Sequence, residues 1–313
     1  MDLRALRYFV ETVRHNSFTL AAEHLCVTQS TVSKMLRQLE DELGQPLLLR
    51  DGRQLRLTDA GRVVFERGQQ ALGLMRELGR ELDDLTTLAR GELTVGLPPM
   101  VNLLFPPVVK AFREQHPEVS LNLRESGGQV IEQQVASGEL ETGVTVLPAD
   151  PALGLATLGV GSHPVLVVGP REAAWTRASR LDLAELAGEP LVLPPDDFSL
   201  TRQVRDAFRA IRAEPLIVAQ SGQWDFLVAM AAAGLGTTLI PAPLLARLQP
   251  DEALAVRALA EPAISWKVAL IHAPGRYLSH AARAWLAVCE AVLAPSPDGL
   301  NSADNSNATE TAP

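Results

Sequence analysis

The 313-residue sequence contains only two cysteines, and this scarcity argues against a disulfide-stabilised secreted protein. Cys26 and Cys289 fall in different predicted domains, so a disulfide framework is not expected. We interpret both as small buried or partly buried thiols in a reducing cytoplasm, with a redox switch as the alternative.

Long apolar runs are also missing, since none approaches the ~20 residues that a membrane-spanning helix needs. The N-terminal stretch MDLRALRYFVETVRHNSF lacks the uninterrupted apolar core of a signal peptide. We therefore expect neither a membrane partner nor export, and place the protein in the cytoplasm.

Signals of an enzyme are absent from the sequence as well. The six histidines show no metal-ligand spacing, and no Ser–His–Asp or Cys–His arrangement can be supported. Gly234-Leu235-Gly236 lies between a predicted helix and a predicted strand, the reverse of a dinucleotide-binding fingerprint. We expect no catalytic residues, no metal and no other cofactor.

An excess of positive charge is missing too, because the chain carries a net charge of −9. The acidity is unevenly distributed. Residues 1–58 hold eight Lys or Arg against seven Asp or Glu, whereas the remainder holds 20 against 30. The total charge therefore does not exclude a nucleic-acid partner for the first 58 residues.

The stretch from Ser17 to Arg37 predicts two short helices separated by a tight turn, and the second helix is two-sided. Its apolar residues recur at spacings of four, three and four: Val32, Leu36, Leu39 and Leu43. Its opposite face carries short hydroxyls and long cations, which suit phosphates and base edges: Ser30, Ser33, Lys34 and Arg37. This pattern is typical of the recognition helix of a helix-turn-helix.

Two further elements follow this pair of helices. LLLRDGRQLRLT joins two apolar-basic runs at Asp51-Gly52, which predicts a hairpin wing with Arg50 and Arg53 near its tip. From about Thr58 to Ala89, one long helix carries a heptad seam: Val64, Gly68, Ala71, Met75, Leu78, Leu82, Leu85 and Ala89. We interpret this helix as a dimerisation element, with packing on its own domain as the alternative.

Strand and helix patterns alternate from Arg90 onward, which indicates α/β layers with largely parallel sheets in two lobes. Helices are expected near residues 102–115, 129–138, 200–211, 224–233 and 280–293. The resulting domains are a winged helix-turn-helix at 1–60, a linker helix at 61–89 and an effector domain at 90–295. Within the effector domain, lobe I covers about 90–161 and 268–295 and lobe II about 162–267. The polar tail at 296–313 is expected to be disordered.

Residues 1–61 strongly resemble the N-terminal domain of LysR-type transcriptional regulators, and a looser resemblance continues to about residue 293. The shared motifs are Leu3-x-x-Leu6-x-x-Phe9, Ser17-Phe18-Thr19-x-Ala21-Ala22, Gln29-x-x-x-Ser33, Leu39-Glu40, Leu43-Gly44-x-Pro46-Leu47 and Leu57-Thr58-x-Ala60-Gly61. Two positions depart from the family pattern. Ser30 and Thr31 follow Gln29 where proline is frequent, and Leu48 stands where an aromatic residue is common.

The resemblance implies a winged helix-turn-helix, a dimer through the linker helix and an effector domain like those of periplasmic binding proteins. Such regulators sit on double-stranded promoter DNA as dimers or tetramers, and a small-molecule effector alters their shape. RNA polymerase is a further candidate partner. The candidate DNA-binding residues are Ser17, Thr19, Gln29, Ser30, Thr31, Ser33, Lys34, Arg37, Arg50 and Arg53. Ser17 and Thr19 could instead cap a helix, and the whole face could be a merely solvated one.

The candidate effector site lies at strand-to-helix turns, because ligands of α/β sheets bind beyond the carboxyl ends of strands. Its residues are Pro99, Met100, Val101, Gly127, Gly128, Gln129, Phe198 and Trp224. Ordinary loop geometry is the alternative for each turn. A glycine-opened helix attracts an anion, and the chain has few aromatic residues, so a small organic acid is the expected effector.

Two functions follow. The first is an effector-responsive transcription factor on an operator with dyad symmetry. The second is a small-molecule binding protein, or an enzyme, on a periplasmic-binding-protein-like fold.

Overall fold

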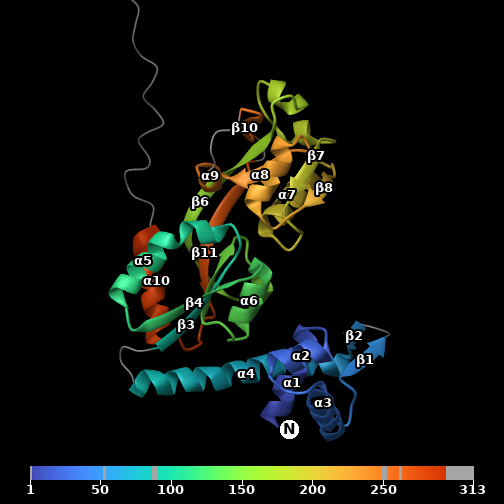
Figure 1. Cartoon of the computed structure of the whole chain (residues 1–313), viewed down its shortest axis with the longest axis vertical. Helices are drawn as coiled ribbons and strands as arrows, with labels where there is room; N and C mark the ends of the chain where they lie inside the picture. The colour runs from blue at the N-terminus through green and yellow to red at the C-terminus, as the bar shows by residue number, and fades with distance from the viewer. Residues whose placement is uncertain (1, 52–53, 87–90, 248–251, 261–262, 294–313) are drawn as a thin grey trace, which may run out of the picture. The chain divides into compact units, whose positions relative to one another are not determined.

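The computed structural model describes residues 2–51, 54–86, 91–247, 252–260 and 263–293 (Figure 1). The chain divides into two compact units, the first built on residues 1–87 and the second on most of residues 88–313. The expected tail at 296–313 lies outside the described residues. In the described residues, no helix is both long enough and apolar enough to cross a membrane.

Three helices form the core of the first unit: α1 (Leu3–Arg14), α2 (Phe18–His24) and α3 (Gln29–Leu43). Each helix is preceded by a capping residue whose side chain accepts a backbone N–H of the first turn. The caps are Asp2 for α1, Ser17 for α2 and Thr28 for α3. The apolar faces meet through Phe9 and Val10 of α1 and Leu36 and Leu39 of α3. A second cluster of Tyr8, Ala22 and Val32 closes the three-helix packing.

The wing is a two-stranded antiparallel hairpin, as the sequence predicts. Strand β1 (Leu48–Asp51) pairs with β2 (Gln54–Leu57), and Asp51 lies opposite Gln54. The expected turn at Gly52 and the side chain of Arg53 lie outside the described residues.

The long helix α4 (Asp59–Thr86) follows the wing, and Thr58 immediately precedes its first residue. The Thr58 hydroxyl accepts the Gly61 N–H at 2.8 Å and donates to the Pro46 carbonyl at 2.7 Å. A Cβ on Gly61 would stand 2.0 Å from the Leu47 carbonyl oxygen, so only glycine allows this approach of helix to strand.

The predicted seam of α4 divides into two parts. Its first part packs on the helix-turn-helix, because Val64 contacts the core and a Cβ on Gly68 would meet Leu6 at 2.8 Å. Farther along, large apolar side chains are exposed on the helix: Leu74, Met75, Leu78, Leu82 and Leu85. Packing on its own domain therefore applies to one end of the helix, and the other end presents an apolar stripe.

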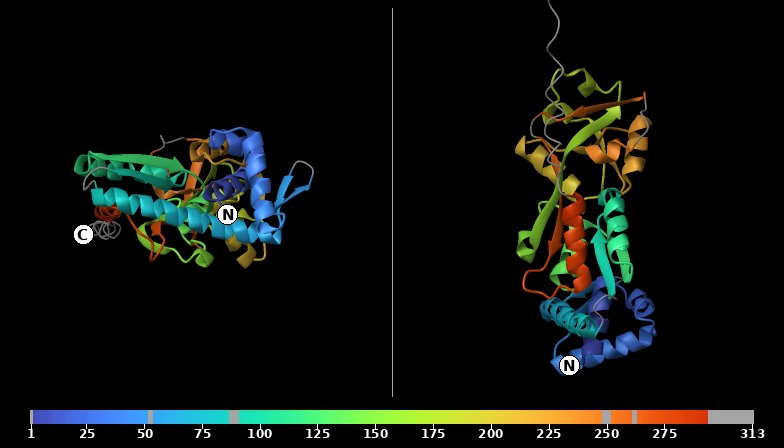
Figure 2. Two further views of the ribbon diagram at one scale, coloured as in Figure 1. Left: turned by 90° about the horizontal axis from the view of Figure 1, so that it is seen from below. Right: turned by 90° about the vertical axis from the view of Figure 1, so that its left-hand side faces the viewer.

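In the second unit, a first lobe is built on the parallel strands β3 (Gly91–Leu97), β4 (Val119–Glu125) and β5 (Thr142–Val146). Helices α5 (Pro106–Gln115) and α10 (His280–Leu293) lie side by side on one face (Figures 1 and 2). Trp285 of α10 packs edge-on against Phe112 of α5. Helix α6 (Gly128–Ala136) packs Ile131 near Gly143 of β5. Two short 3₁₀ turns, at Val101–Leu104 and Pro151–Leu153, follow β3 and β5.

Two long strands connect this lobe to the next one. Strand β6 (Ala156–Pro170) and β11 (Ser265–His272) pair antiparallel with each other, and β11 also pairs antiparallel with β5. The expectation of largely parallel sheets is therefore only partly met. The periodicity of each strand indicated a buried segment but carried no information on the direction of its partner.

The second lobe contains the parallel pair β7 (Pro190–Leu193) and β8 (Leu216–Gln220). Strands β9 (Thr238–Pro241) and β10 (Leu254–Ala258) both pair antiparallel with β6. Its helices are α7 (Ser199–Ala210), α8 (Trp224–Ala232) and α9 (Ala242–Leu245), with 3₁₀ turns at Ala174–Arg177 and Leu183–Leu186. Strand β10 is an addition to the elements that the sequence predicts.

Candidate DNA interface and effector site

The two faces of α3 differ as the sequence predicts. Val32, Leu36 and Leu39 are buried, which fixes the rotation of the helix on the core. The exposed residues of the opposite side are Gln29, Ser30, Thr31, Lys34 and Arg37, and Ser33 is half-buried beside them. Leu43 differs from the expectation, because it lies at the last turn of the helix and remains 37% exposed.

Hydroxyl groups gather at the N-terminal end of α3. The Thr28 hydroxyl lies 2.9 Å from that of Ser30 and 2.8 Å from that of Thr31, and it accepts the Thr31 N–H. Gln29 donates from its side-chain amide to the Ser33 hydroxyl at 3.2 Å. A helix N-terminus carries partial positive charge, so these groups form an anion-attracting end on the polar face. Thr28 is absent from the residues predicted from the sequence, because its capping role depends on where the helix begins.

Ser17 and Thr19 stand at the start of α2. The Ser17 hydroxyl accepts the Leu20 N–H at 3.3 Å, so its capping role is confirmed, whereas Thr19 is exposed. Phosphate contact by either residue stays a prediction.

The wing is held in place by hydrogen bonds to the recognition helix α3 and to the turn between α1 and α2. The Glu40 carboxylate accepts the N–H groups of Leu47 at 2.7 Å and Leu48 at 3.2 Å. On the second strand, Leu55 donates its N–H to the Asn16 side chain at 3.3 Å. Arg50 lies in β1, and Arg53 lies outside the described residues.

These elements define the class of protein. The chain is a winged helix-turn-helix DNA-binding protein, in which a recognition helix and a hydrogen-bonded wing precede a two-lobed α/β domain suited to ligands.

Among the predicted effector residues, the turn after β3 has an unusual backbone. Met100 adopts φ 73 and ψ −42, a conformation that a residue with a side chain rarely takes. The side chains of Met100 and Val101 are buried, while Pro99 is half-buried. Strained backbone of this kind is frequent at ligand-binding turns.

The turn that opens α6 faces the second lobe. A Cβ on Gly127 would stand 3.1 Å from the Asp197 carboxylate, and one on Gly128 would stand 3.3 Å from the Thr145 hydroxyl. The structure thus brings the Gly127–Gln129 turn close to residue 197, immediately before Phe198. Asp197 is exposed, whereas its neighbour Asp196 pairs with Arg205 at 3.0 Å.

Phe198 and Trp224 lie in the second lobe, partly buried against its core. A Cβ on Gly222, two residues before Trp224, would stand 3.4 Å from the Phe198 ring. Phe198, just before α7, therefore lies next to the turn at Gly222 that leads into Trp224 and α8.

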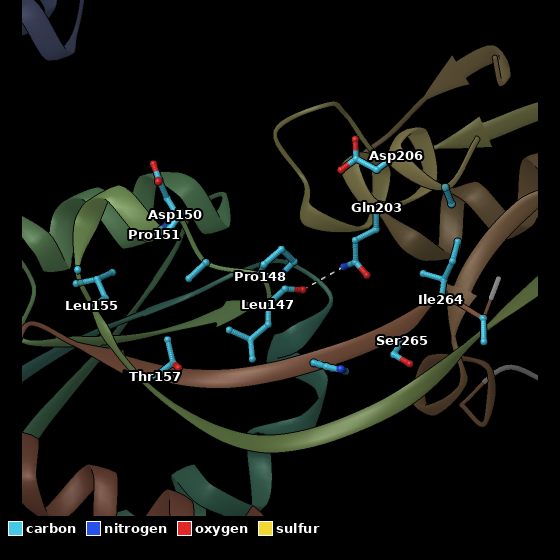
Figure 3. Close-up of a pocket in the computed structure, with 15 residues that line it drawn as sticks. Leu147, Pro148, Asp150, Pro151, Leu155, Thr157, Gln203, Asp206, Ile264 and Ser265 are labelled. Carbon is cyan, nitrogen blue, oxygen red and sulfur yellow. Dashed lines mark hydrogen bonds between the residues drawn. The ribbon is translucent and has the colours of Figure 1, made fainter. Parts of the chain in front are cut away.

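A separate pocket of about 720 Å³ lies beside the long strands (Figure 3). Gln203 of α7 reaches across it and donates to the Leu147 carbonyl at 3.2 Å. Thr157 and Ser265 lie on β6 and β11 in the same lining. None of the predicted effector residues lines this pocket. Its residues were missed because they come from separate segments, among them the stretch after β5, helix α7 and strand β11, which meet only in the folded domain.

Comparison with known proteins identifies both domains. Residues 3–62 match the family described as bacterial regulatory helix-turn-helix protein, lysR family. Residues 86–294 match the LysR substrate binding domain. The HTH-type transcriptional regulator YwbI of Bacillus subtilis is 38% identical over 287 residues, which cover 91% of this chain and 95% of that protein. IlvR of Caulobacter vibrioides is 32% identical over 255 residues, covering 78% and 83%.

Solved structures agree on the fold. A full-length OxyR variant from Pseudomonas aeruginosa superposes with a TM-score of 0.62 at 24% identity, covering 93% of this chain and 94% of that chain. Full-length CbnR in complex with its target DNA gives 0.59 at 20% identity, covering 93% and 100%.

The chain therefore belongs to the LysR family of DNA-binding transcriptional regulators, with an effector-binding domain after the helix-turn-helix. Members of this family are regulators of transcription rather than enzymes.

Proposed function

We propose that this regulator reads promoter DNA with the outer face of α3 and that a small organic acid, held between the lobes of the second domain, modulates its action there. The observation that carries the first half is the exposed set Ser30, Lys34 and Arg37 on a helix whose opposite face is buried. Arg and Lys suit guanine edges and phosphates, and Gln29 suits adenine.

The wing supports the same reading. Because Glu40 and Asn16 fix both strands to the helix-turn-helix, the hairpin can add backbone contacts beside the recognition helix. Arg50 lies in β1, and we propose Arg53 from the sequence as a second contact, since a narrow minor groove would attract such side chains.

The effector proposal rests on the turns around Met100, Gly128 and Asp197. The N-terminal end of α6 attracts anions, and the Asp197 carboxylate stands beside it. An acidic effector would therefore compete with Asp197 for this position. Such an exchange offers a way for ligand binding to alter how the lobes meet.

A dimer is the proposed working unit, and two dimers could form a tetramer. The exposed stripe of Leu74, Met75, Leu78, Leu82 and Leu85 recurs at the spacing of a helix–helix seam. A two-fold axis through paired α4 helices would place two recognition helices on an operator with dyad symmetry. The site of action would be the cytoplasm, where promoter DNA and RNA polymerase are found.

A mobility-shift assay on the DNA upstream of the gene tests the DNA-binding half. We expect retention that weakens steeply as salt rises, because phosphate contacts release counterions. No salt-sensitive retention of any DNA would favour the rival function, a small-molecule binding protein or enzyme on this fold.

A thermal-shift screen of metabolites on the full chain tests the effector half. Small carboxylates are expected to raise the melting temperature, since a ligand that binds the folded state stabilises it. Asp197→Asn should increase the shift by removing the competing carboxylate. If no small carboxylate raises the melting temperature of either the wild type or Asp197→Asn, the organic-acid proposal fails and the DNA-binding proposal is unaffected.

A further inference from the structure

A cluster of metal-ligating side chains lies on the helix-turn-helix, away from the polar face of α3. Glu11 and His15 stand one turn apart at the end of α1, and His24 is the last residue of α2. Their potential ligand atoms all lie within 4.8 Å of one another. The nearest distances are 3.7 Å from the Glu11 carboxylate oxygen Oε2 to Nε2 of each histidine.

The local backbone explains why these residues meet. His15 ends α1 as its C-cap, and Asn16 then adopts φ 47, which turns the chain back into α2. Asn16 is anchored in turn by the hydrogen bond that its side chain accepts from Leu55 of the wing. The cluster thus stands on two helices whose mutual position is already fixed by buried contacts, among them Tyr8 with Ala22.

The Glu11 carboxylate is oriented toward the two histidines. Its Oε1 atom accepts from the Arg14 guanidinium at 3.3 Å, which leaves Oε2 directed at the two imidazoles. The Glu11 side chain is only 12% exposed, whereas His15 and His24 are 34% and 59% exposed. One buried, positioned oxygen and two accessible nitrogens give an ion a path of entry and a fixed first ligand.

We propose that Glu11, His15 and His24 form a binding site for a divalent transition metal, with Zn²⁺ as the ion that fits the donor set. Two imidazole nitrogens and one carboxylate oxygen suit zinc, whereas Mg²⁺ and Ca²⁺ favour oxygen donors. Tetrahedral zinc with bonds of about 2.1 Å spaces its ligand atoms about 3.4 Å apart. The Glu11–His distances need to close by only a few tenths of an ångström, and water would complete the coordination.

Such an ion would link the end of α1 to the end of α2, the first helix of the helix-turn-helix. It would therefore brace the support on which the recognition helix rests. This inference goes beyond the proposed function and does not depend on an effector or an operator.

Isothermal titration of ZnCl₂ into the untagged, EDTA-treated full chain tests the site. We expect saturable binding of one Zn²⁺ at this site. His15→Gln and His24→Gln should each weaken it by at least about tenfold, because each removes a direct ligand. His280→Gln is the matched control, since it removes an exposed histidine of the second unit and should leave this binding unchanged.

A second measurement protects the test against loss of fold. Zn²⁺ should raise the melting temperature of the wild type and of His280→Gln but not of His24→Gln, while circular dichroism without metal stays the same in all three. Absence of saturable binding in the wild type would overturn the proposal. Wild-type affinity in both His15→Gln and His24→Gln would overturn it as well, because the zinc would then be bound elsewhere.

Discussion

The Glu40 carboxylate accepts the backbone N–H of Leu47 at 2.7 Å and thereby joins the recognition helix to the first strand of the wing. The same oxygen accepts the Leu48 N–H, so one side chain satisfies two donors that begin β1. The Leu39-Glu40 motif thus has a divided role. Leu39 fixes the helix on the core, and Glu40 fixes the wing on the helix.

Replacing Glu40 with alanine should loosen the wing. The change removes a charged acceptor from two backbone donors, and hydrogen bonds to charged groups contribute about 1.5–3 kcal/mol each. Hydrogen exchange of the full chain should show faster exchange at the Leu47 and Leu48 amides, and affinity for DNA should fall. Gln38→Ala, an exposed position on the same helix, is the control and should alter neither. Unchanged protection in Glu40→Ala would contradict the assigned role.

Placing a charge in the exposed stripe of α4 should prevent dimer formation. Burying a leucine contributes about 2 kcal/mol, so Leu78→Glu loses that contribution in both helices and adds two buried charges. Light scattering after size exclusion should report a monomer for Leu78→Glu and a dimer or tetramer for wild type. Glu81→Ala changes a neighbouring exposed position and should keep the wild-type mass. An unaltered mass for Leu78→Glu would place the interface elsewhere.

The two cysteines should differ sharply in reactivity. Burial raises the pKa of the Cys289 thiol to about 12, and the nearby Glu290 charge acts in the same direction. At pH 8 the native Cys289 is therefore protonated and inert, whereas Cys26 is exposed. A thiol reagent such as DTNB should label one cysteine in the native protein and both in denaturant. Cys26→Ser should abolish native labelling, and any remaining native reaction would show that Cys289 is accessible.

The sequence predicted the local elements well because their signals are local. The faces of α3, the hairpin across Asp51 and the length of α4 all follow from periodicity, turn residues and caps within a few positions. The capping role of Ser17 is a further case, since the side chain and the amide that it binds are three residues apart.

Relationships between distant segments could not be predicted in the same way. Nothing in the sequence shows that Asp197 stands beside Gly127, or that β6 and β11 run antiparallel, because both depend on how the sheet closes. The Glu11–His15–His24 cluster was missed for this reason. Glu11 and His15 are neighbours one helical turn apart, but His24 joins them only when α2 folds back beside α1.

The most direct test of the account is the affinity of the Lys34→Ala protein for a fluorescent duplex from the region upstream of its gene, measured by anisotropy over a range of salt concentrations. Lys34 is exposed on the polar face of α3, so its loss should weaken binding by about 1–3 kcal/mol, or about 5- to 150-fold, without unfolding the chain. If Lys34 contacts a phosphate, the slope of log affinity against log salt should fall by about 1. Lys110→Ala, which removes an exposed lysine of α5, should bind as wild type. Equal affinity of wild type and Lys34→Ala would contradict the assigned DNA-reading face.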